Sequence, residues 1–163
     1  SNTFQNKVAL ADAYFLANRI DEAVALYESC LTGTFTENEH VNIQLIHCYF
    51  KQKRYSDIIS KAKIVYHIPQ FQNSKAHIIF AQTLAAISEV NLAENEFKKM
   101  NAKFANYESR YQYSLFLVDQ NRREEAKQLL QEMLNEKKHL SSYEKRASKQ
   151  WINLAADQLK KCN

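Results

Sequence analysis

Histidine and cysteine are the residues of this chain that could bind a metal ion or act as nucleophiles. The 163 residues include five histidines and three cysteines. His40 and His47 are seven positions apart, so a single helix could carry both on one face. No HExxH or CxxC motif is present, and no carboxylate stands at ligand spacing. We therefore predict no metal site and no cofactor, and we expect the histidines at the surface or in a groove.

Catalysis would need a nucleophile next to a base, and His47 with Cys48 is the nearest approach to such a pair. Adjacent residues of a helix point in different directions, so these two side chains cannot work together. The single glycine, Gly33, cannot form a glycine-rich loop around a phosphate. We predict that the protein is not an enzyme.

The cysteines and the hydropathy pattern indicate the cellular compartment in which the protein is expected. Cys30 and Cys48 lie in helical apolar patterns, where a thiol acts as a small hydrophobic side chain. An odd cysteine count without a disulfide framework is typical of a reducing compartment, so we expect a cytoplasmic protein. The chain contains no apolar run of about 18 residues, the length that a helix needs to span a bilayer. It also shows no signal peptide. The helical pattern starts almost at the first residue, so we expect the chain to be part of a longer protein.

The C-terminal stretch is basic, although the net charge of the chain is only +4. Its lysines and arginines are Lys137, Lys138, Lys145, Arg146, Lys149, Lys160 and Lys161. Glu144 and Asp157 are interspersed, and no series of aromatic residues that could stack on bases accompanies them. A solvated helix face explains this stretch, and a surface that binds nucleic acid or anionic lipid is the alternative.

A pattern of apolar and small residues recurs four times along the chain. Ala23, Ile58, Ala93 and Ala126 are separated by 35, 35 and 33 residues, and a similar apolar pattern surrounds each of them. One glycine and one proline are too few for the tight turns of a strand-rich fold. A repeat of this length is typical of stacked helical hairpins, none of which can bury its apolar face alone.

We predict an all-α fold of four helical hairpins and a C-terminal capping helix, forming one domain over residues 1–163. The repeats are expected at about 4–34, 38–69, 73–103 and 107–136, and the capping helix at about 141–161. Ser141 with Glu144 fits a capping box at the start of that helix, whose apolar stripe is Trp151, Leu154, Ala155 and Leu159.

Local signals predict where the hairpin helices begin and end. Asp21, Ser56 and Asn91 are expected to cap the second helices of the first three hairpins. Gly33 is expected to take the left-handed conformation beyond the end of its helix. The single proline, Pro69, is expected to end the second hairpin.

These residues resemble the tetratricopeptide repeat (TPR) family. Leu10-Ala11-x-x-Tyr14, followed by Ala23, Tyr27 and Cys30, is similar to the signature of one such repeat. The third unit matches as Phe80-Ala81-x-x-Leu84, Ala93, Phe97 and Met100, and the fourth as Tyr113-Ser114-x-x-Leu117, Ala126, Leu130 and Met133. The second is the most degenerate, with Ile46 and Ile58 at positions where small residues are usual. The resemblance implies a right-handed α-solenoid that acts as a protein-interaction scaffold.

A weaker resemblance points to a group of uncharacterised bacterial TPR proteins. It rests on Pro69-x-Phe71, His77-Ile78-x-Phe80-Ala81, Arg122-Arg123-x-Glu125-Ala126, and Tyr143-x-x-x-Ala147 with Trp151-Ile152-x-Leu154-Ala155. In that group a membrane-anchoring segment precedes a cytoplasmic repeat domain. The resemblance implies that contact with a membrane would come only through a segment outside this sequence.

In TPR proteins the first helix of each hairpin lines an inner, concave surface, so the resemblance implies a binding groove there. The implied groove residues are Val8, Asp12, Phe15, Ile43, His47, Phe50, Ile78, Gln82, Tyr111 and Leu115. Most are apolar, which is typical of a site for a peptide or a helix. The alternative is that these residues contact neighbouring helices, or that the last helix of the chain fills the groove.

Some TPR domains grip the C-terminal carboxylate of chaperones with Lys and Asn side chains, and the corresponding positions here do not fit. They are Val8, Asp12, Gln44, Lys75 and Ile79, of which Lys75 alone matches. Asp12 would repel a carboxylate. We therefore do not expect this function.

The expected function is a protein–protein interaction scaffold whose partner is a peptide, a helix or a second copy of the chain. The alternative is a binder of nucleic acid or of an anionic membrane surface that uses the basic C-terminal helix. The dependence of the affinity on salt concentration distinguishes the two functions, because binding to phosphates weakens steeply with ionic strength and apolar peptide binding does not.

Overall fold

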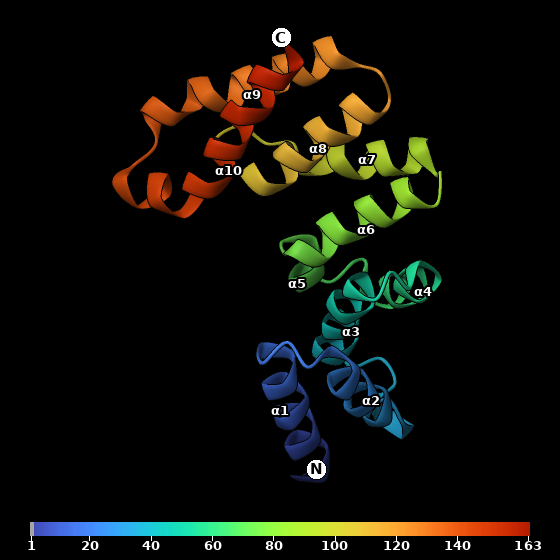
Figure 1. The fold of residues 1–163 in the computed structure, drawn as a ribbon. Helices are drawn as coiled ribbons and strands as arrows, with labels where there is room; N and C mark the ends of the chain where they lie inside the picture. Colours follow the sequence, from blue (N-terminus) through green and yellow to red (C-terminus); the bar gives the residue numbers. More distant parts are fainter. Residues whose placement is uncertain (1) are drawn as a thin grey trace. The chain divides into compact units, whose positions relative to one another are not determined.

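The computed structural model describes residues 2–163, which form ten α-helices, two short 3₁₀-helices and no β-strand (Figure 1). The elements are α1 (Asn2–Leu16), α2 (Ile20–Cys30), η1 (Gly33–Phe35), α3 (Glu39–Lys51), α4 (Tyr55–Val65), α5 (Pro69–Gln72), α6 (Lys75–Ala86), α7 (Val90–Met100), α8 (Tyr107–Asp119), α9 (Arg123–Glu136), η2 (Lys137–His139) and α10 (Ser142–Cys162). The all-α prediction is confirmed. Within residues 2–163, none of the helices has the length and apolar character needed to cross a membrane.

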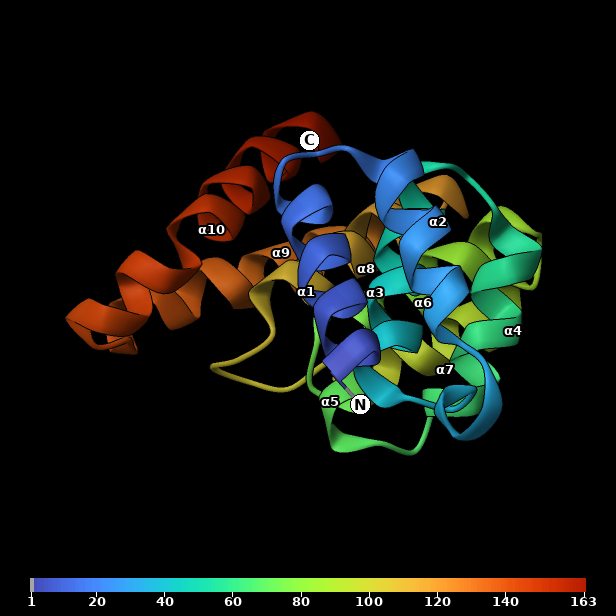
Figure 2. The same cartoon turned by 90° about the horizontal axis from the view of Figure 1, so that it is seen from below.

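The chain divides into two compact units, Ser1–Glu89 and Val90–Asn163, and each is described on its own. The single domain expected over residues 1–163 stays a prediction. In the first unit α1 packs on α2 and α3 packs on α4, while α6 packs on both α3 and α4. Figure 2 shows α1 and α3 on one side of this unit and α2 and α4 on the other.

Small residues at the helix contacts hold the first unit together. Ala11, Ala23 and Ala76 are fully buried, which lets the backbones of neighbouring helices approach closely. Ile46 and Ile58, the large residues of the degenerate second repeat, are also fully buried. Their extra volume is therefore absorbed inside the core rather than exposed to water.

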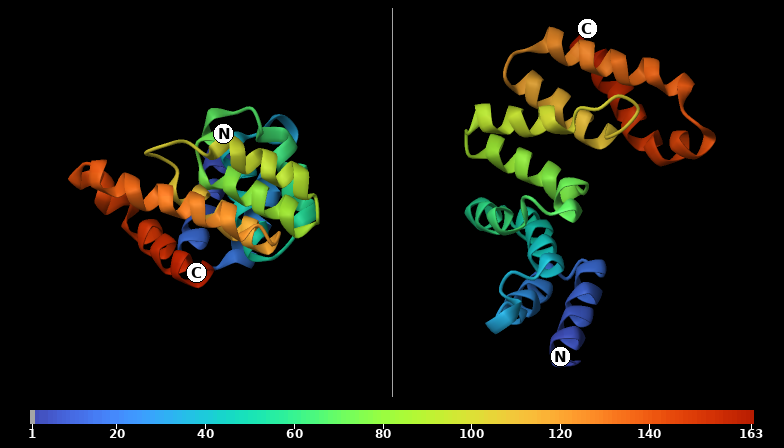
Figure 3. Two further views of the ribbon diagram at one scale, coloured as in Figure 1. Left: turned by 90° about the horizontal axis from the view of Figure 1, so that it is seen from above. Right: turned by 180° about the vertical axis from the view of Figure 1, so that it is seen from behind.

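In the second unit α8 pairs with α9, and α10 packs against both. Both views of Figure 3 show α10 (red) running close to α9 (orange). Ala155 is fully buried in their shared core, and Trp151 and Leu159 pack against that core as predicted. Ile152 and Cys162 belong to the same core and were not part of the predicted stripe. The capping box is confirmed, since Ser141 and Glu144 each accept a 3.1 Å hydrogen bond from the other's backbone N–H.

One backbone turn recurs after α1, α3, α6 and α8. Its central residue has a positive φ in each case: 59° at Asn18, 57° at Lys53, 67° at Ser88 and 60° at Asn121. The next residue donates its N–H to the carbonyl five positions earlier at 2.8–2.9 Å: Arg19 to Tyr14, Arg54 to Tyr49, Glu89 to Leu84 and Arg122 to Leu117. This is the Schellman motif that ends a helix. The turns therefore recur at the intervals of 35, 35 and 33 residues that the sequence pattern has.

The predicted N-caps Asp21, Ser56 and Asn91 are wrong, because α2, α4 and α7 begin before them. The Schellman turn fixes the start of the following helix, so these three residues fall inside its first turn. Gly33 does adopt a positive φ of 57°, as predicted.

The N-cap residue immediately before α2, α4 and α9 is an arginine, whose side chain does not cap the helix. Each guanidinium binds the acid three residues later: Arg19 with Glu22, Arg54 with Asp57 at 2.9 Å, and Arg122 with Glu125 at 2.5 Å. These acids lie in the first turn, where a negative charge stabilises the helix dipole.

The left-handed turn residues give a stability prediction. Lys53 is an exposed lysine at a φ that favours glycine, so Lys53→Gly should stabilise the first unit by about 0.5–1 kcal/mol. Asn18→Gly is the matched control, with a smaller expected gain because asparagine tolerates this conformation. Urea denaturation followed by circular dichroism measures both. A destabilised Lys53→Gly variant would contradict this account of the turn.

Candidate functional site

The predicted groove residues lie on the first helix of each predicted hairpin. Val8, Asp12 and Phe15 are on α1, Ile43, His47 and Phe50 on α3, Ile78 and Gln82 on α6, and Tyr111 and Leu115 on α8. Ile43 and Ile78 are almost fully buried, at 9% and 8% exposure, so they pack in the core and offer little surface to a ligand. The other eight are partly buried, which leaves part of each side chain accessible.

Phe15 and His47 join two neighbouring helices of the first unit. Their ring centroids are 6.1 Å apart, and the Lys51 ammonium lies 5.9 Å from the centre of the Phe15 ring. Burial lowers the pKa of His47 to about 4, and the charges of Lys75 and Lys51 add to the effect. His47 is therefore neutral at pH 7, where one ring nitrogen can donate a hydrogen bond and the other can accept one.

Asp12 holds α1, α2 and α3 together. Its carboxylate accepts a short hydrogen bond from the Tyr27 hydroxyl and pairs with His40 Nε2 at 2.9 Å. Gln44 Nε2 donates to the same Tyr27 hydroxyl at 3.3 Å. Burial and the bond to Asp12 raise the pKa of Tyr27, so its hydroxyl stays protonated and donates. Asp12 thus has structural partners in this unit, in addition to its predicted place in the groove.

In the second unit the last helix covers part of the predicted surface. The Tyr111 ring lies 6.0 Å from the ring of Trp151 on α10, and Tyr111 packs against the core that α10 completes. This arrangement matches the alternative in which the chain's own last helix fills the groove at that position. We therefore restrict the candidate site to the first unit, with Phe15, His47 and Phe50 at its centre.

The cysteines have structural positions. Cys30, Cys48 and Cys162 are all buried and free, which confirms the reading of Cys30 and Cys48 as small hydrophobic side chains. Burial raises the pKa of Cys48 to about 11, so its sulfur is a thiol rather than a nucleophilic thiolate at neutral pH. Among residues 2–163, no three His, Cys, Asp or Glu side chains form a group that could hold a metal ion.

Two features of the molecule were not predicted from the sequence. One is a buried ion pair between Arg110 and Glu136 in the second unit. The other is a pocket in which Lys137 of η2 joins Lys145 and Lys149 of α10. The spacing of Lys145 and Lys149, four residues apart on one helix, was a signal for the second feature.

In comparisons with known proteins, no family model matches this chain and no curated protein matches its sequence. The TPR resemblance is accordingly carried forward as part of the proposal below.

Proposed function

We propose that this chain is a helical-repeat scaffold of the TPR type, a right-handed α-solenoid that binds a peptide or a helix of a partner protein. The observation that supports it most is the Schellman turn that recurs at Asn18, Lys53, Ser88 and Asn121. The same turn at nearly regular intervals of 33–35 residues is typical of stacked helical hairpins. We propose no enzymatic activity for this chain, and we propose a cytoplasmic location.

The proposed binding surface combines apolar and polar groups on α1, α3 and α6. Phe15 and Phe50 hold the same position in successive repeats, 35 residues apart, and both are partly accessible. His47 and Gln82, also 35 residues apart and partly accessible, each supply hydrogen-bonding groups. Apolar contacts provide most of the affinity in such sites, and a few polar groups fix the orientation of the bound segment.

Charge favours one kind of segment. The Lys51 ammonium lies 5.9 Å from the centre of the Phe15 ring, while the Asp12 carboxylate of α1 is paired with His40. A partner segment with an acidic residue beside its apolar face would therefore complement this surface. We propose an amphipathic helix of that composition, from another protein or from a second copy of the chain.

The experiment selects peptides from a random displayed library against the whole chain and measures their affinity by fluorescence anisotropy. The Phe15→Ala, Phe50→Ala double variant should bind the selected peptides at least about tenfold more weakly, because each buried aromatic anchor contributes more than about 1 kcal/mol. Phe15 and Phe50 are only partly buried, whereas Tyr27 is fully buried in the same core, so the melting temperature of the double variant should fall less than that of Tyr27→Ala.

Ile64→Ala is the matched control, since it removes an apolar side chain of α4 that is already 38% exposed. Its affinity for the peptides should equal that of the unmodified chain. The proposal fails if no peptide is enriched, if the control loses affinity equally, or if the double variant unfolds as readily as Tyr27→Ala.

A further inference from the structure

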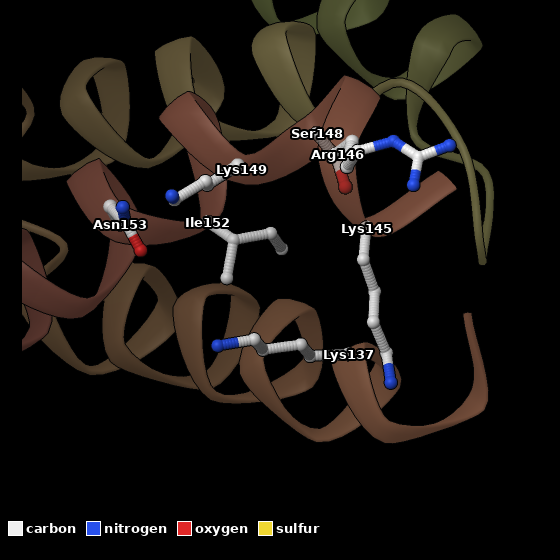
Figure 4. Close-up of a pocket in the computed structure, with 7 residues that line it drawn as sticks. All are labelled: Lys137, Lys145, Arg146, Ser148, Lys149, Ile152 and Asn153. Carbon is white, nitrogen blue, oxygen red and sulfur yellow. The ribbon is translucent and has the colours of Figure 1, made fainter. Parts of the chain in front are cut away.

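A pocket of about 200 Å³ opens in the second unit between η2 and the first half of α10 (Figure 4). Its lining residues are Lys137, Lys145, Arg146, Ser148, Lys149, Ile152 and Asn153. Four of the seven carry a positive charge and none carries a negative one. The pocket is independent of the peptide surface proposed for the first unit.

The side chains around the pocket differ in direction. Figure 4 shows Lys137 running beneath Ile152, with Lys145 and Lys149 on either side of Ile152 and Arg146 pointing away. Ile152 is only 3% exposed, so it forms an apolar wall from the core. Three lysine side chains with flexible stems therefore lie around one small apolar surface, and rotation of the stems can bring their ammonium groups toward it.

The cations of the pocket have no carboxylate partners within residues 2–163. The ion pairs found there involve other lysines and arginines, such as Lys127 with Glu124 and Arg110 with Glu136. Glu144, the nearest acid along α10, uses its carboxylate in the capping box with Ser141. Like charges that face one pocket without a counter-ion favour a bound anion.

We propose that this pocket binds a phosphate monoester. Lysine ammonium groups bind phosphate as compact point charges, and three of them can match a group with a charge close to −2. The Asn153 amide can donate a further hydrogen bond, and Ile152 with the lysine stems can contact the carbon atoms next to the ester oxygen. The ester could be a small soluble molecule or a lipid headgroup.

Nucleic acid fits this pocket less well. No aromatic residue lines it, so bases would have nothing to stack on. The other lysines of the helix, Lys160 and Lys161, lie about 16 Å farther along the α10 axis from Lys149, which leaves no continuous basic track along the helix. The side chains that line this pocket suit a single anionic group.

The test titrates the whole chain with glycerol 3-phosphate and follows backbone amide chemical shifts by NMR. A second arm measures flotation with phosphatidylcholine vesicles that contain phosphatidic acid, a lipid phosphate monoester. We expect shifts at Lys145, Lys149 and Ile152 in the first arm, or binding of phosphatidic acid over phosphatidylglycerol in the second. A positive first arm assigns a soluble ester, and a positive second arm alone assigns a lipid.

The Lys145→Gln, Lys149→Gln variant should lose at least about tenfold in affinity for the probe that binds. Lys160→Gln with Lys161→Gln removes the same charge from the same helix outside the pocket, and it should change affinity by less than about twofold. All four side chains are exposed, so neither variant should alter the melting temperature. Equal losses in both variants, equal binding of phosphatidylglycerol, larger shifts with a single-stranded DNA oligonucleotide than with glycerol 3-phosphate in the same NMR titration, or no shift and no flotation would each overturn the proposal.

Discussion

Glu136→Gln is expected to destabilise the second unit by about 3–5 kcal/mol, because it breaks a buried ion pair and leaves the Arg110 charge without its partner. Glu136 Oε1 accepts hydrogen bonds from Arg110 Nη1 at 2.7 Å, the Phe104 N–H at 2.7 Å and the Tyr107 hydroxyl at 2.9 Å. Its Oε2 accepts from Arg110 Nη2 at 2.6 Å. The Arg110 side chain is 1% exposed, so water cannot replace the lost contacts.

Chemical denaturation followed by Trp151 fluorescence measures this effect, since the single tryptophan lies in the same unit. Glu124→Gln is the matched control on the same helix. Its 88%-exposed side chain pairs with Lys127 at 3.7 Å, and losing that pair should cost less than about 0.5 kcal/mol. Equal stability of the Glu136→Gln variant and the unmodified chain would show that the pair does not hold this unit together.

The same ion pair makes stability depend on pH. Burial alone would raise the pKa of Glu136, but hydrogen bonds from Arg110, Phe104 and Tyr107 lower it to about 2 from the ordinary value of 4.5. The folded protein therefore holds the carboxylate ionised where the unfolded chain protonates it. This contribution is complete above pH 4.5 and is lost as the pH falls toward 2. The unmodified chain should lose about 3 kcal/mol more than Glu136→Gln across that window.

Removal of α10 by truncation before Ser141 is expected to unfold or aggregate the second unit. The helix contributes Ile152, Ala155 and Cys162 to a core that also contains Leu130 and Met133, and water would reach that core without it. Size-exclusion chromatography and circular dichroism measure the result. A soluble, equally stable truncated chain would show that α10 does not cap this unit.

A milder variant keeps this prediction testable if the truncated chain cannot be purified. Ile152→Ala should destabilise the second unit by about 2–5 kcal/mol, since Ile152 is 3% exposed. Its neighbour Asn153 is exposed, so Asn153→Ala should change stability by less than about 0.5 kcal/mol.

Periodicity made most of the fold predictable from the sequence. The third repeat, expected at about 73–103, contains the helices Lys75–Ala86 and Val90–Met100, and the capping helix expected at about 141–161 is observed as Ser142–Cys162. Pro69 was expected only to end a hairpin, yet it starts the short helix α5, because the first helical turn needs no N–H from that residue. The caps were misplaced because Asn, Lys and Ser occupy left-handed turn positions that glycine would have marked.

The site was less predictable, because it depends on contacts between distant residues. The position of Phe15, His47 and Phe50 follows from the repeat spacing. The contact between the Trp151 and Tyr111 rings depends on how the last helix folds back onto α8, and the residue spacing does not indicate this. Arg110 and Glu136 are 26 residues apart, and nothing in their local sequence indicates that two charged residues are buried together.

The central claim is that the surface formed by α1, α3 and α6 binds a partner segment. The most direct measurement is an NMR titration of the whole chain with a peptide selected from the displayed library. The account predicts that amide shift changes concentrate around Phe15, His47 and Phe50, with little change along α2 and α4. Changes concentrated on α2 and α4, or at the lysine pocket of α10, would contradict it.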